Sequence, residues 1–327
     1  MIRLRGYRLL VGAVLGLLAG GADAQRLTMT QALDGDPFGA APQFSARIQD
    51  RRLAGDVAGV FAMPGETLSV VAREIPAGAD LTLDVNGFGA ARRDNDHSWR
   101  WRAPRQPGLY PITLRNRATG GQMRLNVFVK TPFDPAARQL NGYDIGRYQP
   151  TARARDPRSA PPRGLVEVTA GTTGVHVSPH FTLGDFLCHQ QPQYWPKYVL
   201  IRPRLIAKLE MIRTALINAG IDGNGLVVMS GYRTPWYNAD IGNTTVYSQH
   251  LFGSAADIFV DADADGEMDD LDADGSITAA DAGWLADLVE TLTAQAPELA
   301  GGLSAYPGNR FHGPFVHVDV RGVAVRW

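Results

Sequence analysis

Two short stretches that lie far apart along the chain limit most strongly what it can fold into. Residues 248–257 read Ser-Gln-His-Leu-Phe-Gly-Ser-Ala-Ala-Asp, and residues 315–320 read Phe-Val-His-Val-Asp-Val. The second stretch alternates strictly, so on a β-strand its three valines share one face while His317 and Asp319 share the other. Such a division is uncommon for packing alone. We therefore expect a strand that has an apolar face and a polar, functional face.

His250, Asp257 and His317 provide the donor set of a catalytic zinc site. Such sites use three protein ligands and leave the fourth position to water. Gly253 lies between the first two of these residues and lets the backbone turn so that both can converge. The alternative is that the two histidines are ordinary polar residues at strand ends. Because all three residue types occur together in these motifs, we predict the metal site.

Composition sets the broad class of the protein. Its 327 residues suggest about two domains at ~100–200 residues each. Hydrophobic residues make up 45% of the chain, charged residues make up 20%, and the net charge is −1. Because there is no global basic excess, neither nucleic acid nor an anionic membrane is an expected partner.

Residues 1–24 have the pattern of a secretory signal peptide. Three arginines precede an apolar run over residues 9–19, and Ala22-Asp23-Ala24 offers small residues at the cleavage positions. The apolar run is shorter than the ~20 residues of a comfortable membrane span. The alternative is a retained N-terminal anchor. We expect a periplasmic or secreted protein, with no stable membrane insertion after cleavage.

Cys188 is the single cysteine, so it lacks an intramolecular disulfide partner even in an oxidising compartment. Its neighbours Phe186 and Leu187 are apolar and favour a buried, inert thiol. A zinc site using Cys188 and His189 is the alternative.

The mature chain is expected to contain two domains. We predict a flexible leader at residues 25–44, an all-β immunoglobulin-like sandwich at 45–131, a linker rich in Pro, Arg and Asp at 132–170, and a second domain at 171–327. In the sandwich, short alternating runs are separated by turns, and Asn86-Gly87 is a strong hairpin signal. The two alternating tryptophans, Trp99 and Trp101, are expected in its core rather than on a sugar-binding surface.

The second domain has the pattern of an α+β fold with an antiparallel sheet. Its clearest helix is predicted from Pro203, favourable at the first helical position, to Gly220, a natural C-terminal stop. The buried stripe of this helix is formed by Leu205, Leu209, Ile212 and Leu216. A second amphipathic helix is predicted after Asp281. The domain is predicted to begin with a helix and a strand, followed by the motif at 248–257, a second helix and the strand at 315–320. This order favours an α+β fold.

Three motifs occur in order in this domain: Ser-Gly-Tyr-Arg at 230–233, Ser-x-His-x-x-Gly-x-Ala-x-Asp at 248–257, and Phe-Val-His-Val-Asp at 315–319. Together they resemble the zinc peptidases of the D-alanyl-D-alanine carboxypeptidase group, which includes murein endopeptidases and phage endolysins. The resemblance covers roughly residues 175–327. It implies a small α+β domain with Zn²⁺ on His250, Asp257 and His317, and peptidoglycan cross-bridges or stem peptides as the substrate.

A zinc ion held by two imidazoles and one carboxylate keeps positive charge, so it can polarise a carbonyl and lower the pKa of its water. Arg233 is expected to supply a fixed cation near the developing oxyanion or the substrate carboxylate. The alternative for Arg233 is a structural salt bridge. Ser248 and Tyr232 are expected as supporting groups around the ligands or as packing groups.

The general base departs from the pattern of the resembled group. Many of its members carry Glu, Asp or His two or three residues before the last zinc histidine, where this chain has Phe315 and Pro314. Asp319 and His312 are the candidate catalytic residues that remain. Asp319 has the alternative role of orienting His317 from behind. If neither acts as a base, the domain binds zinc and peptide without cutting.

A second metal-binding pattern lies in the insertion at residues 261–281. Asp-x-Asp-x-Asp-Gly occurs twice in succession, and the second copy matches an EF-hand loop with Asp in place of the usual final Glu. Oxygen ligands suit Ca²⁺ rather than Zn²⁺. The expected calcium ligands are Asp261, Asp263, Asp265, Asp270, Asp272, Asp274, Ser276 and Asp281. We expect a structural Ca²⁺ site, and the alternative is a solvated acidic loop.

These patterns predict an exported zinc metallopeptidase that hydrolyses a peptide bond in peptidoglycan, with the β-sandwich positioning it. The alternative is a non-catalytic, zinc-containing cell-wall binding or scaffold protein on a peptidase-like fold. The missing acid before His317 and the appended sandwich favour this alternative. The sequence names no protein partner for the sandwich.

Overall fold

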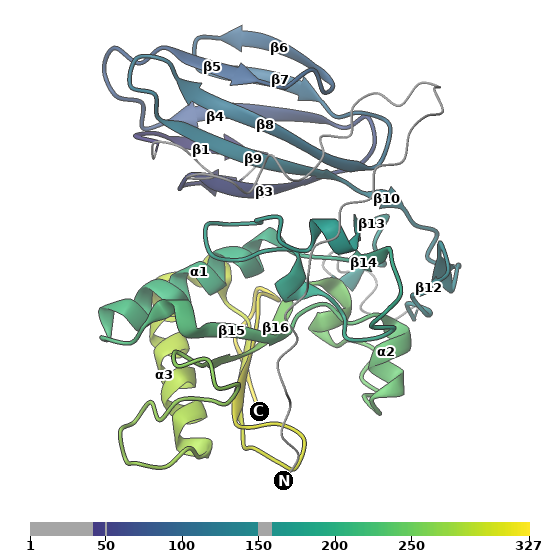
Figure 1. Ribbon diagram of the computed structural model, residues 1–327, viewed down its shortest axis with the longest axis vertical. Helices are drawn as coiled ribbons and strands as arrows, with labels where there is room; N and C mark the ends of the chain where they lie inside the picture. The colour runs from purple at the N-terminus through teal and green to yellow at the C-terminus, as the bar shows by residue number, and fades with distance from the viewer. Residues whose placement is uncertain (1–41, 50, 150–158) are drawn as a thin grey trace, which may run out of the picture. The chain divides into compact units, whose positions relative to one another are not determined.

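The computed structural model describes residues 42–49, 51–149 and 159–327 (Figure 1). Within these ranges the protein has a β-rich, multidomain fold with three α-helices. The expected signal peptide and most of the expected leader lie outside the described residues, as do residues 150–158 of the expected linker. In the described part of the chain, no helix is both long enough and apolar enough to cross a membrane.

Residues 45–129 fold into two β-sheets, with strand orders β2-β1-β4-β7-β6 and β3-β9-β8-β5. The first sheet consists of β1 (Ser45–Ile48), β2 (Arg51–Leu53), β4 (Thr67–Arg73), β6 (Ala90–Asn95) and β7 (Ser98–Arg102). The second consists of β3 (Val57–Ala62), β5 (Leu81–Asp84), β8 (Gly108–Asn116) and β9 (Gln122–Val129). Neighbouring strands pair antiparallel, except that β3 and β9 are parallel.

The core of these two sheets follows from the alternation within their strands. Every second residue of β4 is buried, and the buried residues of β7 are Trp99 and Trp101, at 4% and 0% exposure. The Trp101 indole N–H donates to the Phe88 carbonyl at 2.9 Å, which satisfies the polar edge of a buried ring. The prediction that both tryptophans are core residues is confirmed.

The turn at Asn86-Gly87 does not form the predicted hairpin. Both residues have positive φ, 51° and 75°, as a type I′ turn requires. β5, however, pairs with β8, whereas β6 pairs with β7 in the other sheet. The turn therefore carries the chain from one sheet to the other. The Asn86 side-chain amide anchors it by donating to the Pro111 carbonyl at 2.9 Å.

In the predicted linker, residues 132–170, the described residues form short strands and contribute side chains to a hydrophobic core. β10 (Thr131–Pro132) pairs with β13 (Gly164–Val168), β13 pairs with β14 (Lys197–Val199), and β11 (Gln139–Leu140) pairs with β12 (Tyr143–Asp144). Tyr143, Ile145 and Tyr148 are buried in the same core as the predicted helix at Pro203.

The C-terminal domain contains a five-stranded sheet of order β15-β16-β18-β17-β19. Its strands are β15 (Leu226–Ser230), β16 (Ala255–Val260), β17 (Gly302–Tyr306), β18 (Phe315–Asp319) and β19 (Val325–Arg326). Pairing is antiparallel except between β17 and β19. Its helices are α1 (Pro203–Asn218), α2 (Pro235–Asp240) and α3 (Ala279–Gln295). α3 packs against β17 and β18 and also contacts α1 (Figure 1).

α1 begins at Pro203 as predicted and ends at Asn218, just before Gly220, which has φ +85° and closes the helix. The predicted apolar stripe is buried. Lys208 is also buried, although it is charged: only 3% of it is exposed, and its Nζ donates to the main-chain carbonyl of Asp319 at 3.0 Å. α1 is thus tied directly to the strand that carries His317.

One row of side chains crosses the sheet at its centre. The register places Asp257 of β16 opposite His317 of β18, with Ser230 of β15 opposite Asp257 and Ser304 of β17 opposite His317. The pairing of β16 with β18 therefore brings together two of the three predicted metal ligands.

Stability should depend on the titration of Lys208. Burial lowers its pKa from 10.5 to about 8, so between these values the unfolded chain binds more protons than the folded one. The free-energy penalty for burying the charge is present in full below about pH 8. It fades as the pH rises toward the pKa of free lysine, 10.5. We predict that, from pH 7 to pH 10, the free energy of unfolding of the wild type rises by up to about 3 kcal/mol relative to that of Lys208→Met.

Urea unfolding of both proteins at the two pH values measures this gain. If the difference in the free energy of unfolding between the two proteins stays constant with pH, the pKa of Lys208 is not lowered in the folded protein.

Candidate metal centre

His250, Asp257 and His317 reach one point from three elements. His250 lies on the short 3-10 helix η7 (Gln249–Phe252), Asp257 lies in β16, and His317 lies in β18. Gly253 ends η7 with φ +62°, and a Cβ at this position would lie only 2.1 Å from the Leu200 carbonyl oxygen. Glycine is therefore required at the turn that leads from η7 into β16.

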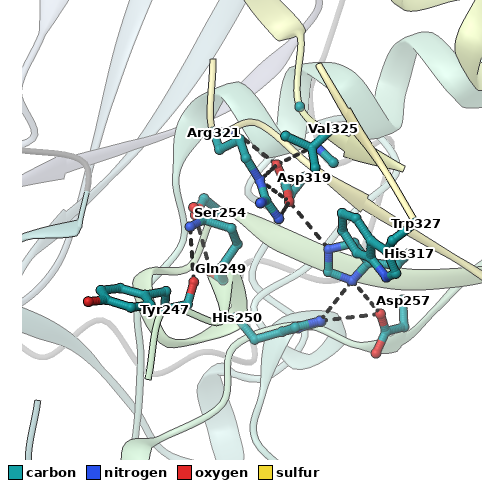
Figure 2. Close-up of polar contacts among 12 residues, drawn as sticks. Tyr247, Gln249, His250, Ser254, Asp257, His317, Asp319, Arg321, Val325 and Trp327 are labelled. Atoms are coloured by element: carbon teal, nitrogen blue, oxygen red, sulfur yellow. Dashed lines mark hydrogen bonds and ion pairs between the residues drawn. The ribbon is translucent and has the colours of Figure 1, made fainter. Parts of the chain in front are cut away.

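The donor atoms of these side chains face one another (Figure 2). His250 Nε2 lies 3.2 Å from His317 Nδ1 and 3.2 Å from Asp257 Oδ1, and His317 Nδ1 lies 2.9 Å from Asp257 Oδ1. For comparison, a tetrahedral ion with bonds of about 2.0–2.1 Å separates its ligand atoms by about 3.3–3.4 Å. All three residues are buried. This group could hold a metal ion.

The outer ring nitrogen of each histidine is engaged elsewhere. His250 Nδ1 lies 2.7 Å from the Gly231 carbonyl, which can only accept, so this nitrogen carries the proton and Nε2 presents a lone pair. Burial lowers the pKa of His250 and favours this neutral form. His317 Nε2 faces Asp319 Oδ2 at 3.4 Å. A carbonyl or carboxylate behind each imidazole is the usual arrangement in metal sites.

The electrostatics of the group favour a positive occupant. Burial favours the neutral acid of Asp257, but His250 and His317 outweigh burial and hold its pKa well below the ordinary value. Burial lowers the pKa of His317, but hydrogen bonds to Asp257 and Asp319 outweigh it and raise this pKa. A metal ion at His317 Nδ1 therefore competes with a proton at the same atom.

Arg233 lies behind Asp257. Its guanidinium forms an ion pair with Asp257 Oδ2, and its Nε donates to Ser230 Oγ at 2.9 Å. Oδ1 of Asp257 is left to face the histidines. The structure thus gives Arg233 the salt bridge that was its alternative role. Contact with an oxyanion or a substrate carboxylate stays a prediction.

Asp319 is fully buried and accepts hydrogen bonds on both oxygens. Oδ1 accepts from the Gly302 and Arg321 backbone N–H groups at 2.7 and 3.0 Å, and Oδ2 accepts from Arg321 Nε at 2.8 Å. Burial alone would raise its pKa, but the contacts with His317, Arg321 and the backbone N–H groups hold it well below the usual range. Since such a carboxylate takes up a proton poorly, Asp319 fits the orientation of His317 better than general-base catalysis.

Tyr232 and Ser248 lie beside η7. Tyr232 is buried, and its hydroxyl lies 2.8 Å from that of Tyr148, which donates to the Leu251 carbonyl at 3.1 Å. Tyr232 therefore stabilises η7, the helix that carries His250, through its hydrogen bond with Tyr148. Ser248 is buried at the position that starts this helix.

His312 lies in the loop before β18. Its Nε2 lies 2.7 Å from the Asn309 amide, its Nδ1 lies 2.8 Å from the Gly313 carbonyl, and its ring packs edge-on against Phe315. These partners belong to its own loop and to the start of β18, and none of them is a member of the metal-binding group.

Three further residues contact the site but were not among the predicted site residues: Ser230, Arg321 and Trp327. The Arg321 guanidinium pairs with Asp319 and lies 5.3 Å from the centroid of the Trp327 ring. The Trp327 ring in turn lies 5.3 Å, centroid to centroid, from the ring of His317. Ser230 belongs to the Ser-Gly-Tyr-Arg motif and Arg321 lies two residues after the last motif, which was the available signal for them. Trp327 had no such signal.

The two acidic loops of the insertion share one conformation. Asp261, Asp263 and Asp265 each place a carboxylate oxygen within 4.8 Å of the others, as do Asp270, Asp272 and Asp274. In each loop the carboxylate of the first aspartate accepts hydrogen bonds from two backbone N–H groups. One belongs to the third aspartate and the other to the glycine that follows it. Both groups lie largely at the surface, where acidic clusters are also common without an ion.

Asp281 has both carboxylate oxygens engaged by backbone N–H groups. It is fully buried at the start of α3, where Oδ1 accepts from the Leu271 N–H and Oδ2 from the Thr278 N–H, both at 2.7 Å. The carboxylate thus ties the second acidic loop to the helix. Ser276 contributes its backbone N–H to Asp274 Oδ1 at 2.8 Å.

A surface hollow of about 920 Å³ lies between α2 and the segment around β12. Arg138, Arg147 and Trp236 are among its lining residues, and the members of the metal-binding group are not. The hollow and the metal-binding group are therefore distinct features of the domain.

The whole chain was compared with known proteins. No protein-family model matches it, and no curated protein matches it either. The interpretation of the site therefore depends on its own geometry and chemistry.

Asp319 should control metal affinity. Asp319→Asn removes the negative charge behind His317, and loss of such a partner weakens metal binding by about 10–100-fold. Competition with a chromophoric chelator measures the dissociation constant. Asp287→Asn, an exposed substitution on α3, is the matched control and should leave the affinity unchanged. Equal affinities for wild type and Asp319→Asn would show that this carboxylate does not support the ligand.

Proposed function

We propose that this protein is an exported zinc metallopeptidase that hydrolyses a peptide bond in peptidoglycan stem peptides or cross-links, as a D,D-carboxypeptidase or an endopeptidase. The observation that carries the proposal is the buried His250-Asp257-His317 group with an acceptor behind each imidazole. The three ordered motifs and their resemblance to zinc peptidases support the substrate class. The predicted signal peptide at 1–24 agrees with a substrate outside the cytoplasm.

The donor set favours zinc over Ca²⁺ and Mg²⁺. Two imidazoles and one carboxylate suit a catalytic zinc ion, whereas Ca²⁺ and Mg²⁺ prefer oxygen ligands. When bound, zinc supplies a Lewis acid and a water of lowered pKa for attack on a peptide carbonyl.

The side chains around the group set its geometry. Arg233 holds Asp257 so that Oδ1 faces the histidines, while Gly231 and Asp319 hold the two rings. The Arg233 fork carries five N–H donors in a fixed plane. Those not engaged by Asp257 and Ser230 are the donors that we assign to the substrate carboxylate or to the carbonyl oxygen that gains charge.

A second function, that of a non-catalytic zinc-containing cell-wall binding or scaffold protein, has one specific observation in its favour. Both oxygens of Asp319 are engaged, and Phe315 and Pro314 replace the acid that many peptidases of the resembled group carry. His312 then remains as the candidate base. A domain that holds zinc and peptide without cutting agrees with these facts.

We also assign the two N-terminal sheets to an immunoglobulin-like sandwich that positions the metal-binding domain on its substrate. The support is the pair of sheets around one core that contains Trp99 and Trp101. Its protein partner is unknown.

Hydrolysis of peptidoglycan is the direct test. Purified mature protein should release peptides with new termini from peptidoglycan, as read by mass spectrometry, and a chelator should abolish this release. His250→Ala and His317→Ala should lower the rate by at least about 10³-fold, because each removes a metal ligand.

His97→Ala, which replaces an exposed histidine of the N-terminal sheets, is the matched control and should retain activity. Zinc binding without release of any peptide would favour the binding protein. Release that survives in His250→Ala would exclude the zinc mechanism.

We propose Ca²⁺ at the acidic loops, in a structural role. The support is the convergence of carboxylate oxygens from Asp270, Asp272 and Asp274, repeated in the first loop. Calcium should raise the melting temperature of the protein, because an ion that binds only the folded state stabilises it. Asp272→Asn with Asp274→Asn should reduce this rise, whereas Asp84→Asn in β5 should not.

Calorimetric titration with Ca²⁺, and with Mg²⁺ for comparison, measures the binding directly. No heat and no thermal shift with Ca²⁺ would leave these loops as solvated acidic turns.

A further inference from the structure

We propose that Trp327 forms a wall of the substrate site and contacts a small apolar side chain, such as the methyl group of alanine, on the peptide residue next to the cleaved bond. This inference rests on the proposed peptidase function. It assigns a specificity-determining contact to a residue outside the three motifs.

The indole of Trp327 is held in one orientation. Its Nε1–H donates to the Tyr306 hydroxyl at 2.6 Å, and its main-chain carbonyl accepts from Ser304 Oγ at 2.6 Å. The Arg321 guanidinium lies 5.3 Å from the ring centroid, in the range of a cation–π contact. A Cβ on Gly302 would lie 2.8 Å from the ring edge, so the indole occupies the space above this glycine. A side chain fixed in this way loses little further freedom when a ligand binds.

The ring is nevertheless open to solvent next to the metal-binding group. Trp327 is 55% exposed, and its ring lies 5.3 Å from that of His317, tilted by 53° (Figure 2). Among the three metal-binding side chains, His317 is the most exposed, at 10% against 3% for His250 and 5% for Asp257. Access from solvent is therefore greatest on the side of His317, where the indole lies.

The chemistry of the wall defines what it binds. An indole face gains most from an apolar group laid against it, while its N–H already has a partner in Tyr306. Stem peptides that end in D-alanyl-D-alanine carry a methyl group on each side of the terminal peptide bond. Because Trp327 lies beside the metal-binding group, a side chain as short as the methyl group of alanine, next to the scissile carbonyl, can contact the indole. This is the substrate feature that we assign to Trp327.

A purely structural role is the competing explanation, because the ring also packs against His317. In that case removal of the indole would disturb the histidine and weaken metal binding. In a substrate-wall role, metal affinity stays unchanged and substrate recognition alone is lost. The two roles are therefore separated by measuring metal affinity and KM on the same variants.

The experiment compares zinc-loaded wild type, Trp327→Ala and Trp327→Phe on three peptides: one ending in D-alanyl-D-alanine and two with glycine in place of either alanine. Loss of the indole should raise KM for the alanine peptide about 5–20-fold and leave kcat within about 2-fold. The preference for alanine over glycine at one of the two positions should disappear in Trp327→Ala and be partly kept in Trp327→Phe. The dissociation constant for zinc should not change.

Trp195→Ala is the matched control. Trp195 is also partly exposed, at 36%, and also carries a cation over its ring, since Lys197 Nζ lies 5.4 Å from the ring centroid. It differs from Trp327 in lying outside the contacts of the metal-binding group. Its removal should leave KM, the alanine preference and zinc affinity unchanged.

Binding of an uncleavable analogue provides a readout that does not need activity. In this analogue a methylene group replaces the carbonyl of the terminal peptide bond, and its affinity for the zinc-loaded proteins is measured by calorimetry. Weaker binding to Trp327→Ala by about 5–20-fold supports the inference, with or without cleavage by the wild type.

Two other results would overturn it. If the wild type cleaves and Trp327→Ala shows the same KM, or loses only zinc affinity, the assignment of Trp327 is wrong while the peptidase function stands. If the wild type neither cleaves the peptides nor binds the analogue, the proposed function fails and this inference fails with it.

Discussion

The C-terminal domain depends on one electrostatic constraint: the buried donor atoms of Asp257 and His317 in its sheet and of His250 in η7 meet at one point. Removing a carboxylate and two imidazoles from water is costly unless every polar atom finds a partner. Asp257 meets this condition with Oδ1 on the histidines and Oδ2 on Arg233. The histidines meet it with their outer nitrogens on Gly231 and Asp319. What remains is a set of inward-facing donor atoms that could hold a single cation.

The backbone makes this convergence possible, and it leaves little freedom for alternatives. Side chains alternate along a strand, so a shift of one residue between β16 and β18 would turn His317 toward the apolar face. Two contacts outside the row oppose such a shift. Lys208 reaches from α1 to the Asp319 carbonyl, and Gly253 brings the chain within van der Waals distance of Leu200 before β16 begins. The metal-binding group is thus fixed by packing and register as well as by its own hydrogen bonds.

The sequence predicted local elements and, through its motifs, the convergence of His250, Asp257 and His317, but it missed several other long-range contacts. Strict alternation located β18 and its polar face, and Pro203 located the start of α1, because strand and helix periodicity are properties of a few neighbouring residues. Asn86-Gly87 shows the limit: the turn geometry is as predicted, but the strands on either side pair in different sheets. Trp327 was missed because only tertiary packing brings it to His317.

Asp319 links His317 to Arg321 and, through it, to Trp327, and these contacts explain why Asp319 is poorly suited to moving protons. One oxygen faces His317 and is also held by Arg321, and the Arg321 guanidinium extends to the ring of Trp327. A carboxylate that orients a ligand and anchors a cation must stay ionised, whereas a general base must gain and lose a proton during each turnover. These demands conflict in one side chain. In the proposed peptidase, His312 then remains as the candidate base, and in the alternative proposal the domain binds peptide without cutting it.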